Sequence, residues 1–291
     1  MRFANILFPA DRSDRCRRAV PHVRQAVEQF HAKLTVLHVV EYPPLALYGD
    51  GVYIPENLLP DLKSAAKDIM ADFARVHFSD LKPKIVVEQG DAGIRIVDRA
   101  NEDKVDLIMI PTHGRGRFRS ALLGSVTSKV LHDAACPVWT DAHTLEEPDS
   151  QHSSWRSIVC ALNTGSHDAE LIRFARDLGE TCAAQVRLVH AVPAPERGIA
   201  ERSIESADLE FTDFLKESAR TSINAMQEEE GTEFQLCVNA GPVSKVVADA
   251  AQRYRADLVL IGRGSIANFA GRLRTHEYSI IRDAPCPVLS I

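Results

Sequence analysis

Residues 4–13, "ANILFPADRS", decide the fold, because they pass from a short apolar run directly into a polar turn. A buried strand of a parallel sheet has this form, with a few apolar residues bounded by turn residues. The same pattern returns as "RSIVCALNTGS" at 156–166, an offset of 152 residues. This recurrence indicates that the chain contains one structural unit twice.

Four further pairs of segments repeat in the same order, while the offset falls from 152 to 150 residues. The pairs are "AKLTVLHVV" at 32–40 with "AQVRLVHAV" at 184–192, "KIVVEQG" at 84–90 with "QLCVNAG" at 235–241, "VDLIMI" at 105–110 with "ADLVLI" at 256–261, and "DAACPVWT" at 133–140 with "DAPCPVLS" at 283–290. The polar segment 141–154 lies between the copies and is interpreted as a linker. We therefore expect two domains, 1–142 and 153–291.

Helical patterns occupy the intervals between the apolar runs. Residues 17–32 place Val20, Val23, Val27 and Phe30 on one face, at spacings of three and four residues. Alternating strands and helices predict two doubly wound α/β domains, each a five-stranded parallel sheet with helices on both faces.

The other helices of the first copy are expected at 58–77, 93–102 and 125–134. In the first of these, Leu62, Ala66, Ile69 and Phe73 share the predicted apolar face.

Ligands of such sheets bind beyond the carboxyl ends of the strands, where the strand order reverses. Strand one of the first copy ends at Ala10 and Asp11, and strand two ends near Val39. Strand four ends at Ile110 and Pro111. All three ends are therefore expected to line one crevice.

The loop after strand four, "PTHGRGRFRSALLGSVTSKV" at 111–130, is glycine-rich and basic before it becomes helical. It contains no GxxxxGK[ST] sequence, and Arg119 stands where a GxGxxG fingerprint needs its third glycine. Gly114 can adopt a positive φ and let the backbone approach a phosphate. Gly124 and Ser125 mark a helix start, where unpaired N–H groups and the helix dipole favour an anion, and Ser125 can cap this helix.

These residues resemble the universal stress protein family, and the likeness covers nearly the whole chain in two tandem copies. The nucleotide motif of that family, G-x-x-G, nine residues, then G-[ST], matches Gly114 and Gly124-Ser125, with Val126 and Thr127 continuing it. The first glycine of the motif falls on Pro111, which cannot donate a backbone N–H.

The resemblance implies an adenine-nucleotide alpha-hydrolase-like fold and ATP bound in the first copy, which Mg²⁺ can accompany. The early aspartate of the family falls on Asp11, and its H-V dipeptide falls on His38 and Val39. Asp11 is suited to accept hydrogen bonds from ribose hydroxyls, and Val39 to form an apolar wall for adenine. The arginines of the loop, beginning at Arg115, can screen phosphate charge.

Structural roles also explain several of these residues. Asp11 is equally suited to cap the helix that follows it, and the two glycines to serve only as turn residues. His38 recurs as His190 in the second copy, which favours a structural histidine. His113 is suited either to contact phosphate or to lie on the surface.

The second copy departs from the motif at several positions. Asp11 is replaced by Asn163, and Val39 by Ala191. The four residues that begin with Gly124 become Arg274-Thr275-His276-Glu277, so that Glu277 would place a carboxylate in the first helical turn. A carboxylate there competes with phosphate for the helix dipole. We therefore expect the first copy to hold nucleotide and the second to serve as a scaffold.

Composition excludes several other classes of protein. The net charge of −6 and the pI of about 6.0 argue against a general nucleic-acid binder. No signal peptide or membrane-spanning segment is expected, and six scattered cysteines without a CxxC pair favour a cytoplasmic protein with reduced thiols.

The sequence supports three functions. The first is an ATP-binding regulatory protein of the stress response, without catalytic residues of its own. The second is a slow ATPase or phosphotransfer protein in which His113 or Asp11 orients water or accepts a phosphoryl group. The third is a scaffold for another small molecule, which three tyrosines in the segment 41–57 are suited to cover.

The final strands of the two copies, "CPVWT" and "CPVLSI", are apolar. The family resemblance implies that such strands pair two domains about a twofold axis. We therefore expect an intrachain pseudo-dimer of the two domains, and the same chemistry is compatible with a homodimer of whole chains.

Overall fold

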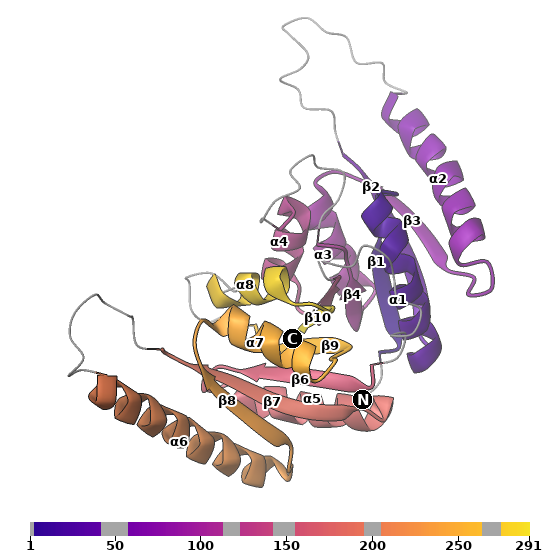
Figure 1. The fold of residues 1–291 in the computed structure, drawn as a ribbon. Coiled ribbons are helices and arrows are strands. Elements are labelled where there is room, and N and C mark those ends of the chain that lie inside the picture. The colour runs from indigo at the N-terminus through magenta and orange to yellow at the C-terminus, as the bar shows by residue number, and fades with distance from the viewer. Residues whose placement is uncertain (1–2, 42–57, 113–122, 142–154, 195–204, 264–274) are drawn as a thin grey trace, which may run out of the picture. The chain divides into compact units, whose positions relative to one another are not determined.

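The computed structural model describes residues 3–41, 58–112, 123–141, 155–194, 205–263 and 275–291. The chain divides into two compact units, with their main parts at Arg2–Asp141 and Ser154–Ile291. Each unit is an α/β structure built on a parallel sheet (Figure 1).

The first unit alternates strands and helices throughout. Its elements are β1 (Asn5–Pro9), α1 (Asp14–Phe30), β2 (Lys33–Val40), α2 (Leu58–His77), β3 (Lys84–Gln89), α3 (Ala92–Glu102), β4 (Leu107–Met109), α4 (Ser125–Asp133) and β5 (Val138–Thr140). The strands lie in the order β3-β2-β1-β4-β5, and each neighbouring pair is parallel. The order reverses between β1 and β4, and this is where the fold positions a ligand.

The second unit repeats this architecture. Its elements are β6 (Ser157–Leu162), α5 (Asp168–Cys182), β7 (Gln185–Val192), α6 (Glu205–Glu230), β8 (Gln235–Ala240), α7 (Val243–Arg253), β9 (Leu258–Ile261), α8 (Thr275–Asp283) and β10 (Val288–Ser290). Its strands lie in the order β10-β9-β6-β7-β8, again with parallel neighbours. The predicted fold class, two doubly wound domains, is confirmed.

Helices cover both faces of each sheet. In the first unit α1 and α2 lie on one face while α3 and α4 pack together on the other, and α5 and α6 are opposed to α7 and α8 in the second unit (Figure 1). The strands β4 and β9 are entirely apolar and buried, as expected for strands covered on two faces.

Within each unit, an aspartate at the equivalent position makes the same backbone contacts. The carboxylate of Asp106 accepts hydrogen bonds from the backbone N–H groups of Ala4 and Asn5, each at 2.8 Å. Asp257 makes the same pair of contacts to Arg156 and Ser157, each at 2.9 Å. This repeated anchor ties the start of the first strand of each unit to the turn before the fourth.

The predicted apolar face of α1 is confirmed, because its four named residues are all buried. The prediction for α2 is wrong in part. Ala66 and Phe73 are buried, but Leu62 and Ile69 are 38% and 39% exposed. The buried face of α2 turns toward Met70 and Ala74, so Leu62 and Ile69 lie at its solvent edge.

Candidate functional site

The carboxyl ends of β1 and β4 form the floor of the candidate site. Ala10 donates its N–H to Leu37 O at 2.8 Å, and Ile110 donates to Trp139 O at 2.9 Å. Both residues are buried and continue the sheet one residue beyond their strands. At these two positions it is the backbone, rather than the side chain, that is suited to face a ligand.

Asp11 forms a tight turn at the end of β1. Its Oδ1 accepts a hydrogen bond from the backbone N–H of Ser13 at 2.9 Å. Ser13, not Asp11, caps α1, because its hydroxyl accepts from the N–H of Cys16 at 3.1 Å. The interpretation of Asp11 as the helix cap is therefore wrong. Arg12, between them, has a left-handed φ of 64°.

The second unit makes a similar turn with Asn163 in place of Asp11. Asn163 Oδ1 accepts from the N–H of Gly165 at 2.7 Å, and Thr164 has the matching φ of 58°. A second group supports this turn, because the buried Asp168 carboxylate accepts the N–H groups of Asn163 and Thr164 at 3.0 and 2.7 Å. Cys16 stands at the position of Asp168 in the first unit, so the two turns place their acidic side chain differently.

The two histidines at the ends of the second strands have a structural role in both units. His38 Nδ1 lies 2.6 Å from Ala10 O, and His190 Nδ1 lies 3.0 Å from Leu162 O. A ring carrying its proton on Nδ1 donates to that carbonyl and secures the strand end. The structural interpretation of His38 is confirmed. Val39, next to it, is partly buried in β2 and pairs in register with Glu88.

The chain after β4 is tied to the start of α4. The Thr127 hydroxyl donates to Pro111 O at 2.8 Å, and the Gly124 N–H donates to Thr112 O at 2.9 Å. Pro111 and Thr127 are both buried, so the last residues before the loop and the first turn of the helix form one rigid unit. His113, Gly114 and Arg115 lie outside the described residues.

The amino end of α4 has the properties of an anion site. Gly124 is the N-cap with φ −58° and ψ 144°, and no side chain caps the helix there. The expectation that Ser125 caps the helix is wrong, because Ser125 is the exposed first residue of the helix itself. The first turn carries no acidic residue, and Val126 is partly buried within it. Its N–H groups have no partner within the helix.

Sequence reasoning missed two residues that shape this site, Thr112 and Asp141. Asp141 Oδ1 accepts from the Thr112 N–H at 2.6 Å and from its hydroxyl at 2.9 Å, and both residues are buried. Arg15 Nη1 lies 3.5 Å from the Thr112 hydroxyl and so brings α1 close to the same point. Asp141, which falls both in the predicted first domain, 1–142, and in the segment 141–154, lies within the first unit. The position of Asp141 directly after β5 was the one feature of the sequence that could have indicated its place at the strand ends.

The second unit differs at the same points. Its β9 ends beside Arg263, whose N–H donates to Ile291 O at 2.6 Å, in place of the Thr112–Asp141 contact. Glu277 lies in the first turn of α8, as predicted, and is buried. It takes the place of Thr127, so the equivalent helix start carries a carboxylate. Arg274 lies outside the described residues.

Metal ligands and reactive thiols are not prominent in the site. Within the part of the chain that the structure describes, no group of three or more His, Cys, Asp or Glu side chains is placed to hold a metal ion. All six cysteines are free, and burial raises the pKa of the Cys16 thiol to about 11. A thiol with so high a pKa is a weak nucleophile at neutral pH.

Comparison with known proteins agrees with this architecture. The family model described as the universal stress protein family matches residues 2–140 and again 154–291. Universal stress protein Sll1654 of Synechocystis is 32% identical over 138 residues, which cover 47% of this chain and 83% of that protein. The chain belongs to the universal stress protein family, as two tandem copies of its domain.

A solved structure shows the same fold over the whole chain. A universal stress protein from Archaeoglobus fulgidus superposes with a TM-score of 0.67 at 18% identity, covering 100% of this chain and 98% of that chain. Another universal stress protein has been solved in complex with cAMP, at 22% identity and a TM-score of 0.32, covering 47% of this chain and 95% of that chain. No helix in the described ranges is long and apolar enough to cross a membrane.

Proposed function

We propose that this protein is an ATP-binding regulatory protein of the stress response, with ATP held in the first unit and the second unit acting as a scaffold. The bound nucleotide would report the energy state of the cell by changing the surface that the first unit presents. The domains at 1–142 and 153–291 and the cytoplasmic location belong to the same proposal.

The observation that carries the proposal is a difference between two otherwise matched units. Both units keep the same turn after the first strand, and both keep the histidine at the end of the second. The first unit combines a partly exposed acid, Asp11, at the first position of that turn with a helix start that carries no acid in its first turn. In the second unit the acid of the turn is the buried Asp168, and the helix start carries Glu277, so the first unit is the better match to an anionic nucleotide.

The chemistry of the first unit suits each part of ATP. The Asp11 carboxylate accepts hydrogen bonds and so matches the ribose hydroxyls, and Val39 supplies apolar surface for adenine. The start of α4, at Gly124 and Ser125, offers N–H groups and the positive end of the helix dipole to the phosphates. His113, Gly114 and Arg115 are proposed to contact the phosphates, and Ala10, Ile110, Pro111, Val126 and Thr127 to form the floor.

The proposal is tested by identifying what the protein carries. Purified full-length protein is denatured, and the released small molecules are identified by mass spectrometry. ATP in the extract, together with a saturable calorimetric response to added ATP, is the expected result. An extract free of nucleotide, combined with no heat of binding at millimolar ATP, would contradict it and favour a scaffold for another molecule.

Hydrolysis of the bound ATP is a separate question. Asp11 is the only candidate for orienting water that lies among the described residues, and its carboxylate already accepts the Ser13 N–H. We therefore propose the slow ATPase only as the second candidate function. Release of phosphate that disappears on changing Asp11 or His113, without loss of ATP affinity, would reverse that order.

A further inference from the structure

Helix α2 carries an apolar stripe on its solvent side that the fold does not use. Leu62, Ile69 and Val76 are 38%, 39% and 65% exposed and follow one another at intervals of seven residues. Seven residues are close to two helical turns, so the three side chains lie in one line along the helix. An exposed apolar line of this kind is typical of a helix that packs against another helix.

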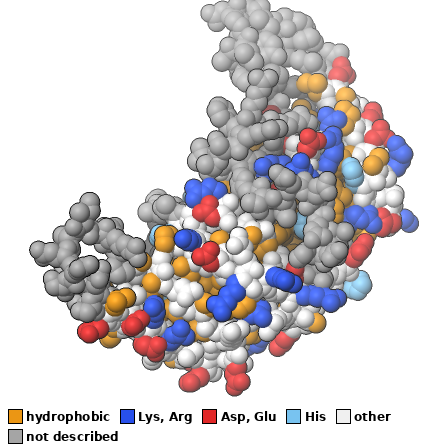
Figure 2. Space-filling model, in the orientation of Figure 1, with side chains coloured by type: hydrophobic (Ala, Val, Ile, Leu, Met, Phe, Trp, Pro, Cys, Tyr) orange, Lys and Arg blue, Asp and Glu red, His pale blue; other side chains and the backbone are white. Residues whose placement is uncertain are grey.

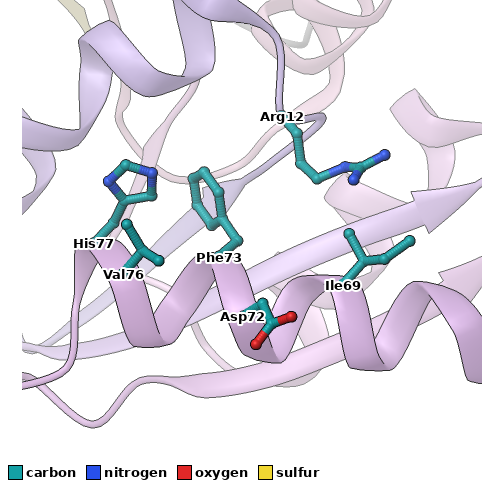
Figure 3. Close-up of a pocket in the computed structure, with 6 residues that line it drawn as sticks. All are labelled: Arg12, Ile69, Asp72, Phe73, Val76 and His77. Atoms are coloured by element: carbon teal, nitrogen blue, oxygen red, sulfur yellow. The ribbon is translucent and has the colours of Figure 1, made fainter.

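A shallow hollow of about 320 Å³ lies beside this stripe (Figure 3). The buried ring of Phe73 forms its floor between Ile69 and Val76, Asp72 and His77 also line it, and Arg12 overhangs it from the loop after β1. Figure 2 shows hydrophobic side chains among charged ones over the α2 side of the first unit, at the upper right. The surface is therefore ridged and can receive a side chain from outside.

Charges beside the stripe indicate what covers it. Asp61, Asp68 and Arg75, each one residue before a member of the stripe, form an exposed row along one flank. The row is acidic toward the start of the helix and basic toward its end. A second α2 lying antiparallel would bring Asp61 of each copy opposite Arg75 of the other.

We propose that the α2 stripe, Leu62, Ile69 and Val76, is a contact surface for a second copy of this chain, with the two α2 helices antiparallel about a twofold axis near Ile69. A twofold contact uses the same patch on both copies, and a stripe centred on one residue meets this requirement. Leu62 of the second copy then packs between Ile69 and Val76, over the hollow.

Two features set the strength of this dimer. The two Asp68 side chains approach each other near the axis and oppose association. One pair of helices of this length also buries less than the roughly 1,200 Å² of a standard interface, so the dimer is weak and concentration-dependent. Arg75 already pairs with Asp72 at 3.2 Å, but both groups are exposed and this pair is easily exchanged.

Sedimentation velocity on the full chain tests the proposal. The mass is expected to rise from 32.1 kDa toward twice that value with increasing concentration. Ile69→Lys should raise the dimer dissociation constant at least about tenfold. The matched control is Ile94→Lys on α3, where the side chain is 45% exposed, and it should leave association unchanged.

Exchanging the charges at positions 61 and 75 tests whether the two helices are antiparallel. Asp61→Arg and Arg75→Asp should each weaken the dimer, and the double variant should restore it, because antiparallel helices pair these two positions. A parent protein that stays monomeric at all concentrations, or an Ile69→Lys variant that associates like the parent, would overturn the proposal. Failure of the double variant to restore association would overturn the antiparallel arrangement.

Discussion

The pair Asp11 and Asn163 separates structure from function within one chain. Both side chains hold the same turn, through Ser13 N in one unit and Gly165 N in the other. The side chain at the start of the turn thus changes from a carboxylate to an amide, while the buried Asp168 adds a carboxylate to the turn of the second unit. The comparison suggests the Asp11→Asn variant as a test of the proposed ribose contact.

Replacing Asp11 by Asn should leave the melting temperature nearly unchanged, because the amide oxygen can still accept the Ser13 N–H. The affinity for ATP should fall by about tenfold, since hydrogen bonds to a charged acceptor are stronger than those to a neutral one. Calorimetry checks the affinity, and Asn163→Asp is the control that should not alter it. An Asp11→Asn variant that binds ATP as tightly as the parent would remove Asp11 from the site.

The cysteines give a second prediction at this scale. Burial raises the pKa of the Cys286 thiol to about 12 and that of the Cys160 thiol well above its ordinary value. Because the thiolate is the reactive form, these two should react with a thiol reagent at pH 8 only after unfolding, while the partly buried Cys237 reacts first. Prompt labelling of all six thiols in the native protein would contradict this.

At the scale of the element, the start of α4 decides whether phosphate binds. Gly124 has ordinary backbone angles, and Ser125 is exposed, so neither position is required by the fold to keep its residue. The corresponding helix α8 differs by placing the buried Glu277 in its first turn. What separates the two helices is the charge at the amino end.

Ser125→Glu should weaken ATP binding by at least about tenfold, because the new carboxylate lies where the phosphates are proposed to bind. It should not lower the melting temperature, since an acid in the first turn of a helix is favourable. Ser125→Gln, of the same size but neutral, is the matched control and should change the affinity much less. Equal effects of the two variants would mean that size, and not charge, determines binding.

The sequence predicts elements better than it predicts their contacts. Periodicity placed α2 at 58–77, and the structure has it at those residues, because a helix long enough to cover a sheet shows its apolar face clearly. Periodicity does not tell which edge of that face meets the sheet, so Leu62 and Ile69 were assigned to the core.

The contacts that were missed join residues far apart in sequence or join side chain to backbone. Asp141 and Thr112 are 29 residues apart, and no local sequence pattern predicts their hydrogen bonds. A helix cap was the alternative interpretation of Asp11, because a turn and a cap call for the same residue type. Family motifs identified the candidate ligand residues, and geometry was needed to divide their structural roles from their proposed chemical ones.

At the scale of the whole molecule, two units with one fold carry different residues at one site. The strand order, the Asp106 and Asp257 anchors and the histidine contacts are common to both. Since the fold is maintained by residues away from the crevice, the second unit can change the crevice without losing its structure. The pairing of the two units through their last strands stays a prediction.

Equilibrium dialysis of the full-length chain against labelled ATP tests whether the first unit alone binds nucleotide. We expect saturation at one ATP per chain, because only the first unit combines Asp11 with an acid-free helix start. We also expect that Ser125→Glu lowers this binding, while Glu277→Gln in the second unit adds no second site, since Asn163 still lacks the charge. Saturation at two ATP per chain, or one ATP that Ser125→Glu does not affect, would contradict the proposal.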